Sequence, residues 1–230
     1  MKERLLRQML LIENTENLKN KTVAVLGLGG VGGSAAVALA RAGVGSLILV
    51  DHDTFSETNL NRQIFAFKET IGKKKCDVAR EYISKIDDSI EIKTLDIFFS
   101  NETKELLFSL QPDFIIDAID TVSAKKTLIV EATKRGVPII SSMGTGNRLN
   151  PEFLKIGKIK DTKGNGCPLA RIMRKELLKE GIEDTPVVFS SEMPIKVSVG
   201  EENGKHSPAS AVFVPQSAGI LSAYFVITSL

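Results

Sequence analysis

The chain has 230 residues, of which 43% are hydrophobic and 25% are charged, the balance of an ordinary globular protein. Its formal net charge of +2 gives no indication of nucleic-acid binding, and its two cysteines, without a CxxC pair, exclude a disulfide framework and argue against a structural zinc site. The charged N-terminal stretch MKERLLRQMLL lacks the apolar run of a signal peptide, so we expect a cytoplasmic protein.

The first 150 residues predict strands that alternate with helices. We expect strands at 22–29, 46–51, 90–95, 113–120 and 138–143. We expect helices at 32–43, 73–86, 102–110 and 123–136, with a long loop at 52–72. This alternation favours an α/β fold with a doubly wound, mostly parallel, Rossmann-like sheet, which binds ligands at the carboxyl edge of its strands.

The pattern changes after residue 150. Residues 153–159 alternate like an antiparallel strand, and 165–181 predict a loop followed by a helix. We expect a single domain, with a nucleotide-binding core at 1–150 and a C-terminal elaboration at 151–230 that faces the substrate.

The last 22 residues are apolar to the end of the chain. Pro215 and Gln216 interrupt them and leave a run shorter than the ~20 residues that a membrane span needs. We therefore expect a buried helix or a subunit contact and no stable membrane insertion. Association with a membrane surface through this segment stays open as an alternative.

A glycine-rich turn follows the first predicted strand. Gly27, Gly29 and Gly32 match the GxGxxG pattern, with the strand before it and the helix after it that the pattern requires. Gly27 permits the tight turn, Gly29 lets phosphate approach the main chain, and Gly32 lets the helix meet the strand. Asp51 ends the second predicted strand, where a carboxylate can accept hydrogen bonds from ribose. This pattern fits NAD and ATP equally.

The next segments favour ATP. The loop 52–72 carries polar and cationic side chains that suit a triphosphate, namely Asp53, Asn59, Asn61, Arg62 and Gln63. Lys73, Lys74 and Lys75 then open a predicted helix, where cations oppose the helix dipole unless several converge on an anion. Asp117 and Asp120 follow the fourth strand, where a carboxylate can hold Mg²⁺ against phosphate oxygens. A solvated basic turn and a helix N-cap at Asp120 are the alternative interpretations.

Together, GLGGVGG, DHD with NLNRQ, Lys75 and DAIDT resemble the ubiquitin-activating-enzyme-like adenylating superfamily, which includes the ThiF-type and MoeB-type adenylyltransferases. The resemblance implies that Asp51 binds ribose, that Asn59, Arg62 and Lys75 bind phosphates, and that Asp120 binds Mg²⁺. RLLRQ resembles the segment whose second arginine, here Arg7, reaches the partner subunit's triphosphate, which implies a homodimer. The expected nucleotide-binding residues are thus Gly27, Gly29, Gly32, Asp51, Asp53, Asn59, Arg62 and Lys75, and the expected catalytic residues are Arg7, Arg62, Lys75 and Asp120.

Two further segments, 167–182 and 187–194, resemble one branch of this superfamily, the tRNA threonylcarbamoyladenosine dehydratases. This resemblance covers essentially the whole chain. It implies that ATP drives cyclisation of the threonylcarbamoyl side chain on a tRNA adenosine, through an acyl adenylate. It also leaves open a monovalent cation near 167–182 and a cysteine-desulfurase-type sulfur-transfer partner.

Local charge agrees with a tRNA partner. Residues 155–180 hold eight basic and three acidic side chains. Arg171, Arg174 and Lys175 lie three and four residues apart, so one helix face can present them to RNA phosphates. Packing is expected from Leu169, Ile172, Met173, Leu177 and Leu178.

Three other functions remain open at this stage. An adenylyltransferase for a ubiquitin-like sulfur carrier is opposed by the absence of CxxC pairs, and an NAD-dependent oxidoreductase by the lack of a hydride-transfer acid–base pair. A silent nucleotide-binding module is the third. Cys167 is an alternative nucleophile at a helix start, although we interpret it as an incidental thiol. His52 and His206 receive no role.

Overall fold

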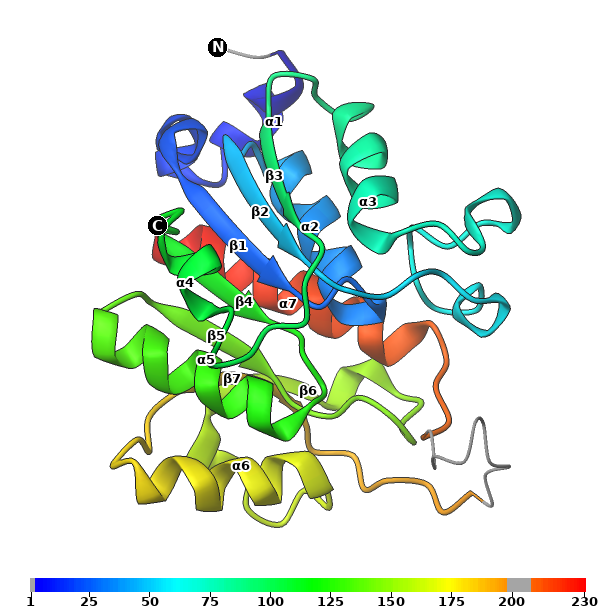
Figure 1. Cartoon of the computed structure of the whole chain (residues 1–230), viewed down its shortest axis with the longest axis vertical. Helices are drawn as coiled ribbons and strands as arrows, with labels where there is room; N and C mark the ends of the chain where they lie inside the picture. Colours follow the sequence, from blue (N-terminus) through cyan, green and yellow to red (C-terminus); the bar gives the residue numbers. More distant parts are fainter. Residues whose placement is uncertain (1–2, 198–207) are drawn as a thin grey trace.

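The computed structural model describes residues 3–197 and 208–230. A seven-stranded sheet in the order β3-β2-β1-β4-β5-β7-β6 crosses the molecule (Figure 1). The strands are β1 (Thr22–Leu26), β2 (Ser46–Val50), β3 (Glu91–Leu95), β4 (Phe114–Asp117), β5 (Ile139–Ser142), β6 (Leu154–Lys158) and β7 (Pro186–Ser190). All neighbouring strands pair in parallel except β6 and β7, which are antiparallel. The predicted doubly wound sheet and the antiparallel strand near 153–159 are both confirmed.

Helices cover both faces of the sheet (Figure 1). They are α1 (Leu6–Met9), α2 (Gly30–Ala42), α3 (Lys75–Ser84), α4 (Lys104–Phe108), α5 (Val122–Arg135), α6 (Pro168–Lys179) and α7 (Phe213–Ser229). One apolar core lies between the sheet and α2, α3 and α7, and the second lies between the sheet and α4, α5 and α6. Each predicted helix of the first 150 residues exists, with ends shifted by a few residues.

The central strands form because their side chains are apolar on both faces. On β1, Val23 and Val25 enter the first core, whereas Ala24 and Leu26 enter the second. A parallel strand covered by helices on both sides reads as a continuous apolar run, which is why this stretch of sequence is easy to recognise.

The C-terminal helix α7 packs lengthwise on α2. An added Cβ at Gly219 would lie 2.1 Å from the main-chain oxygen of Val31, so only glycine permits this approach. Pro215 lies in the first turn of α7, where its missing N–H costs little, and the helix continues through it. The expected buried helix is confirmed for the face that carries Ala218, Ser222 and Val226. Among the described residues, every helix is too short or too polar to cross a membrane.

Candidate functional site

A cavity of about 370 Å³ lies where β1, β2 and β4 end. It is lined by residues from the turn after β1, the loop after β2, the first turn of α3 and the loop after β4. All of the predicted nucleotide-binding residues except Gly32 line it, and so does the predicted magnesium ligand Asp120: Gly27, Gly29, Asp51, Asp53, Asn59, Arg62, Lys75 and Asp120. The position of the cavity at the carboxyl edge of a parallel sheet is the one that this architecture predicts.

In the turn between β1 and α2, each of the three glycines has different surroundings. Gly27 adopts a φ of +84°, and an added Cβ would lie 2.7 Å from the Ala118 oxygen. An added Cβ at Gly32 would lie 1.8 Å from the Gly27 oxygen, so Gly32 permits the helix to pack against the turn. An added Cβ at Gly29 would meet only Gln63 Nε2, at 3.9 Å, so the approach to the N-terminus of α2 is open for an anion.

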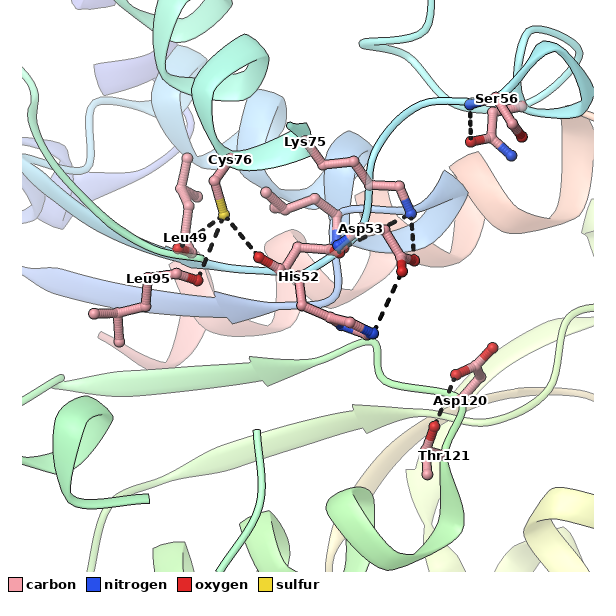
Figure 2. Close-up of polar contacts among 12 residues, drawn as sticks. Leu49, His52, Asp53, Ser56, Lys75, Cys76, Leu95, Asp120 and Thr121 are labelled. Atoms are coloured by element: carbon pink, nitrogen blue, oxygen red, sulfur yellow. Dashed lines mark hydrogen bonds and ion pairs between the residues drawn. The ribbon is translucent and has the colours of Figure 1, made fainter. Parts of the chain in front are cut away.

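Two carboxylates and one lysine line the β2 side of the cavity. Asp51 is buried and accepts hydrogen bonds from the main-chain N–H groups of Leu28 and Asp53, at 2.6 and 2.8 Å. Lys75 is also buried, and its Nζ lies 2.9 Å from Asp53 Oδ2 and 4.0 Å from Asp51 Oδ2 (Figure 2). Asp51 therefore positions the glycine turn, an additional role that the sequence did not indicate.

Lys75 also affects the ionisation of its partner. Partial burial acts to raise the pKa of Asp53, but the hydrogen bond and the positive charge of Lys75 outweigh it and hold that pKa below its usual value. The carboxylate is therefore ionised at neutral pH and keeps the ammonium group of Lys75 at the mouth of the glycine turn.

The loop after β2 brings Arg62 to the cavity. Its Nη1 donates to the Thr58 carbonyl and to Asn61 Oδ1, at 2.7 and 2.8 Å. Within the described chain no carboxylate pairs with this guanidinium, so its charge is available for an anionic ligand. Asn59 fixes the loop by accepting from the Ser56 N–H, at 3.1 Å (Figure 2).

The C-terminal segment holds the same loop from outside. Gln216, in α7, donates to the Arg62 carbonyl at 3.3 Å, and Asn61 donates to the Ser210 carbonyl at 2.9 Å. The last part of the chain therefore helps to build the nucleotide cavity.

The loop after β4 carries Asp120 on the opposite side of the cavity (Figure 2). Asp120 is exposed, and Thr121 Oγ1 lies 3.4 Å from its Oδ1. The strand ends earlier than predicted, at Asp117, because the Asp117 carboxylate accepts from the Ile119 N–H and turns the chain away from the sheet. Asp117 is fully buried and pairs with Lys125 at 2.8 Å, so it supports the loop and does not line the cavity.

His52, Thr145 and Ser210 also line the cavity, although the sequence pattern did not assign them a role. His52 packs edge-on against Phe98, with ring centroids 5.1 Å apart, and its Nε2 lies 3.4 Å from Asp53 Oδ1. Thr145 and Ser210 enter from loops far along the chain. The second histidine, His206, lies outside the described residues.

Arg7 does not line this cavity. The N-terminal segment packs at the C-terminal end of α2, where Gln8 Nε2 donates to the Ala42 carbonyl at 2.8 Å. The glycine turn is at the other end of this 13-residue helix, roughly 20 Å away at 1.5 Å per residue. Arg7 is exposed and lies at the end of α2 that is remote from the nucleotide cavity of its own chain.

In α6, the three basic residues that we expected to bind tRNA are not all exposed. Arg171 and Lys175 are exposed on α6, but Arg174 is half-buried and donates to the buried Thr162 hydroxyl at 2.7 Å. Ile172 and Leu178 are also exposed, so the packing stripe is narrower than expected and consists chiefly of Ala170, Met173 and Leu177.

Both cysteines are buried free thiols. Cys167 caps α6, with its Sγ 3.4 Å from the Ala170 N–H, a structural contact that the sequence did not indicate. Burial, and then the nearby Asp51 charge, raise the pKa of Cys76 to about 12, and its thiol contacts three carbonyls behind the cavity (Figure 2).

Comparison with known proteins agrees with this arrangement. The ThiF family model matches residues 3–177. A tRNA threonylcarbamoyladenosine dehydratase of Bacillus subtilis is 41% identical over 230 residues, covering 95% of this chain and 90% of the relative. The Escherichia coli enzyme of the same name is 34% identical over 67% of this chain and 57% of its own length.

Solved structures resemble the whole chain. The E. coli dehydratase in complex with ATP superposes with a TM-score of 0.89 at 26% identity, covering 99% of this chain and 93% of that one. The same enzyme in complex with AMP gives a TM-score of 0.86 at 27% identity, covering 94% and 88%. The E. coli protein MccB with ATP, at 22% identity and a TM-score of 0.67 over 99% of this chain and 63% of that one, shares the fold.

Proposed function

The chain belongs to the ThiF family, and we propose that it is an ATP-dependent tRNA threonylcarbamoyladenosine dehydratase. Its substrate is N6-threonylcarbamoyladenosine in tRNA, and its product is the cyclic, dehydrated form of that nucleoside. The observation that carries the proposal is the cavity itself, which combines an open glycine turn with two cations and a free carboxylate, in a chain whose closely similar relatives carry this activity in their names.

The reaction begins with a poor electrophile. The carboxylate of the threonylcarbamoyl group attacks the α-phosphorus of ATP, pyrophosphate leaves, and an acyl adenylate results. A neighbouring nucleophilic atom of the modified nucleoside then attacks the carbonyl carbon, and AMP departs with the oxygen that the carboxylate has lost. Attack within one molecule gains a large advantage from proximity.

This chain's residues act on the phosphates. We propose that Arg62 and Lys75 offset the negative charge that develops there, while the main chain at Gly29 and Gly30 receives an anion at the start of α2. Lys75 is buried and held by Asp53, so it donates from a fixed position.

Asp120 fits a magnesium ligand. Its exposed carboxylate lines the cavity, and no cation of the described residues pairs with it. Mg²⁺ commonly binds through one or two carboxylates and phosphate oxygens, and would supply charge neutralisation at the triphosphate. The only group of three potential ligands found among the described residues, Asp51, His52 and Asp53, is less suited, because Asp51 holds the glycine turn and Asp53 holds Lys75.

We propose a homodimer in which Arg7 completes the partner's cavity. The support is its exposure and its distance from the cavity of its own chain. Next to it, Leu6 and Leu10 are 45% and 85% exposed, which leaves an apolar surface for a second copy. A cytoplasmic location and a cysteine-desulfurase-type sulfur-transfer partner stay predictions from the sequence.

The monovalent cation that the resemblance left open near residues 167–182 stays a prediction from the sequence.

Mass analysis of tRNA nucleosides tests the function. Unmodified tRNA, and tRNA that carries threonylcarbamoyladenosine, are incubated with the protein and ATP, with ATP omitted in the control. Loss of one water from the modified nucleoside is the expected result. Pyrophosphate exchange that depends on a carrier protein ending in Gly-Gly, without any change in the tRNA, would contradict the proposal.

A further inference from the structure

A second cavity, of about 290 Å³, lies at the start of α6. Its lining includes Asn165, Cys167, Arg171 and Arg174, and no carboxylate from the described part of the chain. A pocket that gathers two guanidinium groups without an acidic side chain is complementary to an anion.

Asn165 provides a buried donor without a partner. The residue is only 7% exposed, and its Oδ1 accepts from the Cys167 N–H at 3.1 Å, which fixes Nδ2 as the group that must donate. Nδ2 is buried and has no hydrogen-bond partner among residues 3–197 and 208–230. Since buried amide groups are normally hydrogen-bonded, this side chain indicates a missing acceptor at the cavity.

The N-terminus of α6 also favours a hydrogen-bond acceptor at this cavity. The helix has 12 residues and no acidic side chain in its first turn. Its cap is the thiol of Cys167, a weak acceptor for the Ala170 N–H. Arg171 nevertheless stands in the first turn, where the helix dipole disfavours a cation unless an anion lies between them.

The cavity is close to the nucleotide site. An added Cβ at Gly144 would lie 3.1 Å from Cys167 Sγ, and the next residue, Thr145, lines the nucleotide cavity. Arg148 joins the two regions, because it donates to the carbonyls of both Gly144 and Asn165. A molecule whose anionic group binds at α6 can therefore extend to the nucleotide cavity.

The surface beyond the cavity is suited to a chain of phosphates. A neighbouring cavity of about 460 Å³ shares Gly164 and Asn165 with the first. Lys155 and Lys163 line it together with one carboxylate, Asp161, which accepts from the Lys158 N–H. Neither Lys155 nor Lys163 forms an ion pair within the described residues. A free anion would need only the first cavity, whereas a nucleic-acid backbone can use both.

We propose that the cavity at the start of α6 binds one backbone phosphate of the tRNA substrate. Asn165 Nδ2, the Arg171 guanidinium and the main chain of α6 donate to it, and the Thr162 hydroxyl holds Arg174 beside it. This inference rests on the proposed function and assigns the RNA a specific contact. It also replaces the three-residue set expected from helix spacing, because Asn165 takes the place of Lys175 at the phosphate.

Two single substitutions test the contact. Asn165→Asp keeps the acceptor for the Cys167 N–H and replaces the unpartnered donor by a negative oxygen. Arg171→Gln removes an exposed charge without disturbing the core. Arg80→Gln is the matched control, because Arg80 is exposed on α3, far from α6 (Figure 1). Binding of substrate tRNA is titrated at several salt concentrations, with ATP affinity and urea unfolding measured alongside.

Loss of one phosphate contact should lower the salt slope by roughly 0.7 to 0.9 and weaken tRNA binding about fivefold at 0.15 M salt. We expect this for Arg171→Gln, at least as much for Asn165→Asp, and wild-type behaviour for Arg80→Gln, with ATP affinity unchanged throughout. If the wild type converts tRNA but the two variants bind it normally, or if Arg80→Gln loses as much, the inference is wrong and the function stands. Equal losses of tRNA and ATP affinity would assign the cavity to the nucleotide and also overturn it. A wild type that neither binds nor converts tRNA would overturn both.

Discussion

Replacing Lys125 by Met tests whether the buried ion pair between Lys125 and Asp117 supports the loop that carries Asp120. Lys125 lies on α5 and is fully buried, as is its partner Asp117. Its Nζ donates to Asp117 Oδ2 at 2.8 Å, to Ser141 Oγ at 3.0 Å and to the Ser142 carbonyl at 3.0 Å. Methionine retains most of the apolar stem but removes all three hydrogen bonds and leaves the Asp117 carboxylate without a counter-charge.

The expected cost follows from the contacts that remain. Removing one partner of a buried ion pair costs about 3–5 kcal/mol, a large share of the 5–15 kcal/mol that typically stabilises a folded domain. Asp117 keeps hydrogen bonds from Ser141 Oγ and the Ile119 N–H, so we expect a loss near the lower limit, about 3 kcal/mol. ATP turnover should fall as well, because the loop to Asp120 begins at Asp117.

Urea unfolding gives the measurement, and the neighbouring Lys126→Met provides the control. Lys126 forms partly exposed ion pairs with Glu176 and Glu180, so its loss should change the free energy of unfolding little. The double variant Lys125→Met with Asp117→Leu should recover much of the stability, since an apolar pair can replace a buried ion pair, but it should not recover turnover. A loss for Lys125→Met no larger than that for Lys126→Met would refute this reasoning.

Four further expectations concern the site and the interface. Asp120→Ala should reduce ATP turnover at least about 100-fold with an unchanged urea midpoint, because the side chain is exposed; normal turnover would remove Asp120 from the metal site. Mixing inactive Arg7→Ala with inactive Asp120→Ala should restore some activity through hybrid dimers, and verified heterodimers without activity would argue against the trans arrangement. Gly32→Ala should unfold the turn, since its Cβ would lie 1.8 Å from the Gly27 oxygen. Gly29→Ala should fold normally, and titration with ATP should show a loss of affinity. Equal unfolding of the two variants would contradict this difference. Because burial raises the pKa of Cys76 to about 12 in the folded chain, from 9.0 for a free thiol, its contribution to stability should be full below pH 9 and decrease as the pH rises toward 12, and iodoacetamide at pH 8 should label it only after unfolding.

The central part of the fold was predictable because its signals are local. Val23 to Leu26 and Leu47 to Val50 are short apolar runs, and their length together with the flanking glycines favours buried strands over helices. The ends were less predictable. The fourth strand was extended to residue 120, but the Asp117 carboxylate bonds to the Ile119 N–H and to Lys125, and these tertiary contacts end the strand early.

Some residues of the candidate site could be predicted from local sequence, and others depend on tertiary contacts. Gly27, Gly29 and Asp51 lie in a fixed spacing around two consecutive strands, so the sequence places them together. Thr145 and Ser210 reach the cavity from loops whose paths depend on the whole fold. The hydrogen bond from Arg174 to Thr162 could not be predicted either, because the spacing of residues along a helix does not show which loop packs against that helix.

One buried arginine, Arg148, connects the last third of the chain to the nucleotide-binding core. Arg148 is 4% exposed, and among the described residues it has no carboxylate partner. It donates to the carbonyls of Gly144, Asn165 and Glu192, which follow β5, precede α6 and follow β7. Three loops that could move separately are therefore held by one planar group whose bonds have fixed directions. Because one of these loops continues into the nucleotide cavity and another lines the cavity at the start of α6, Arg148 holds the two cavities in one fixed arrangement.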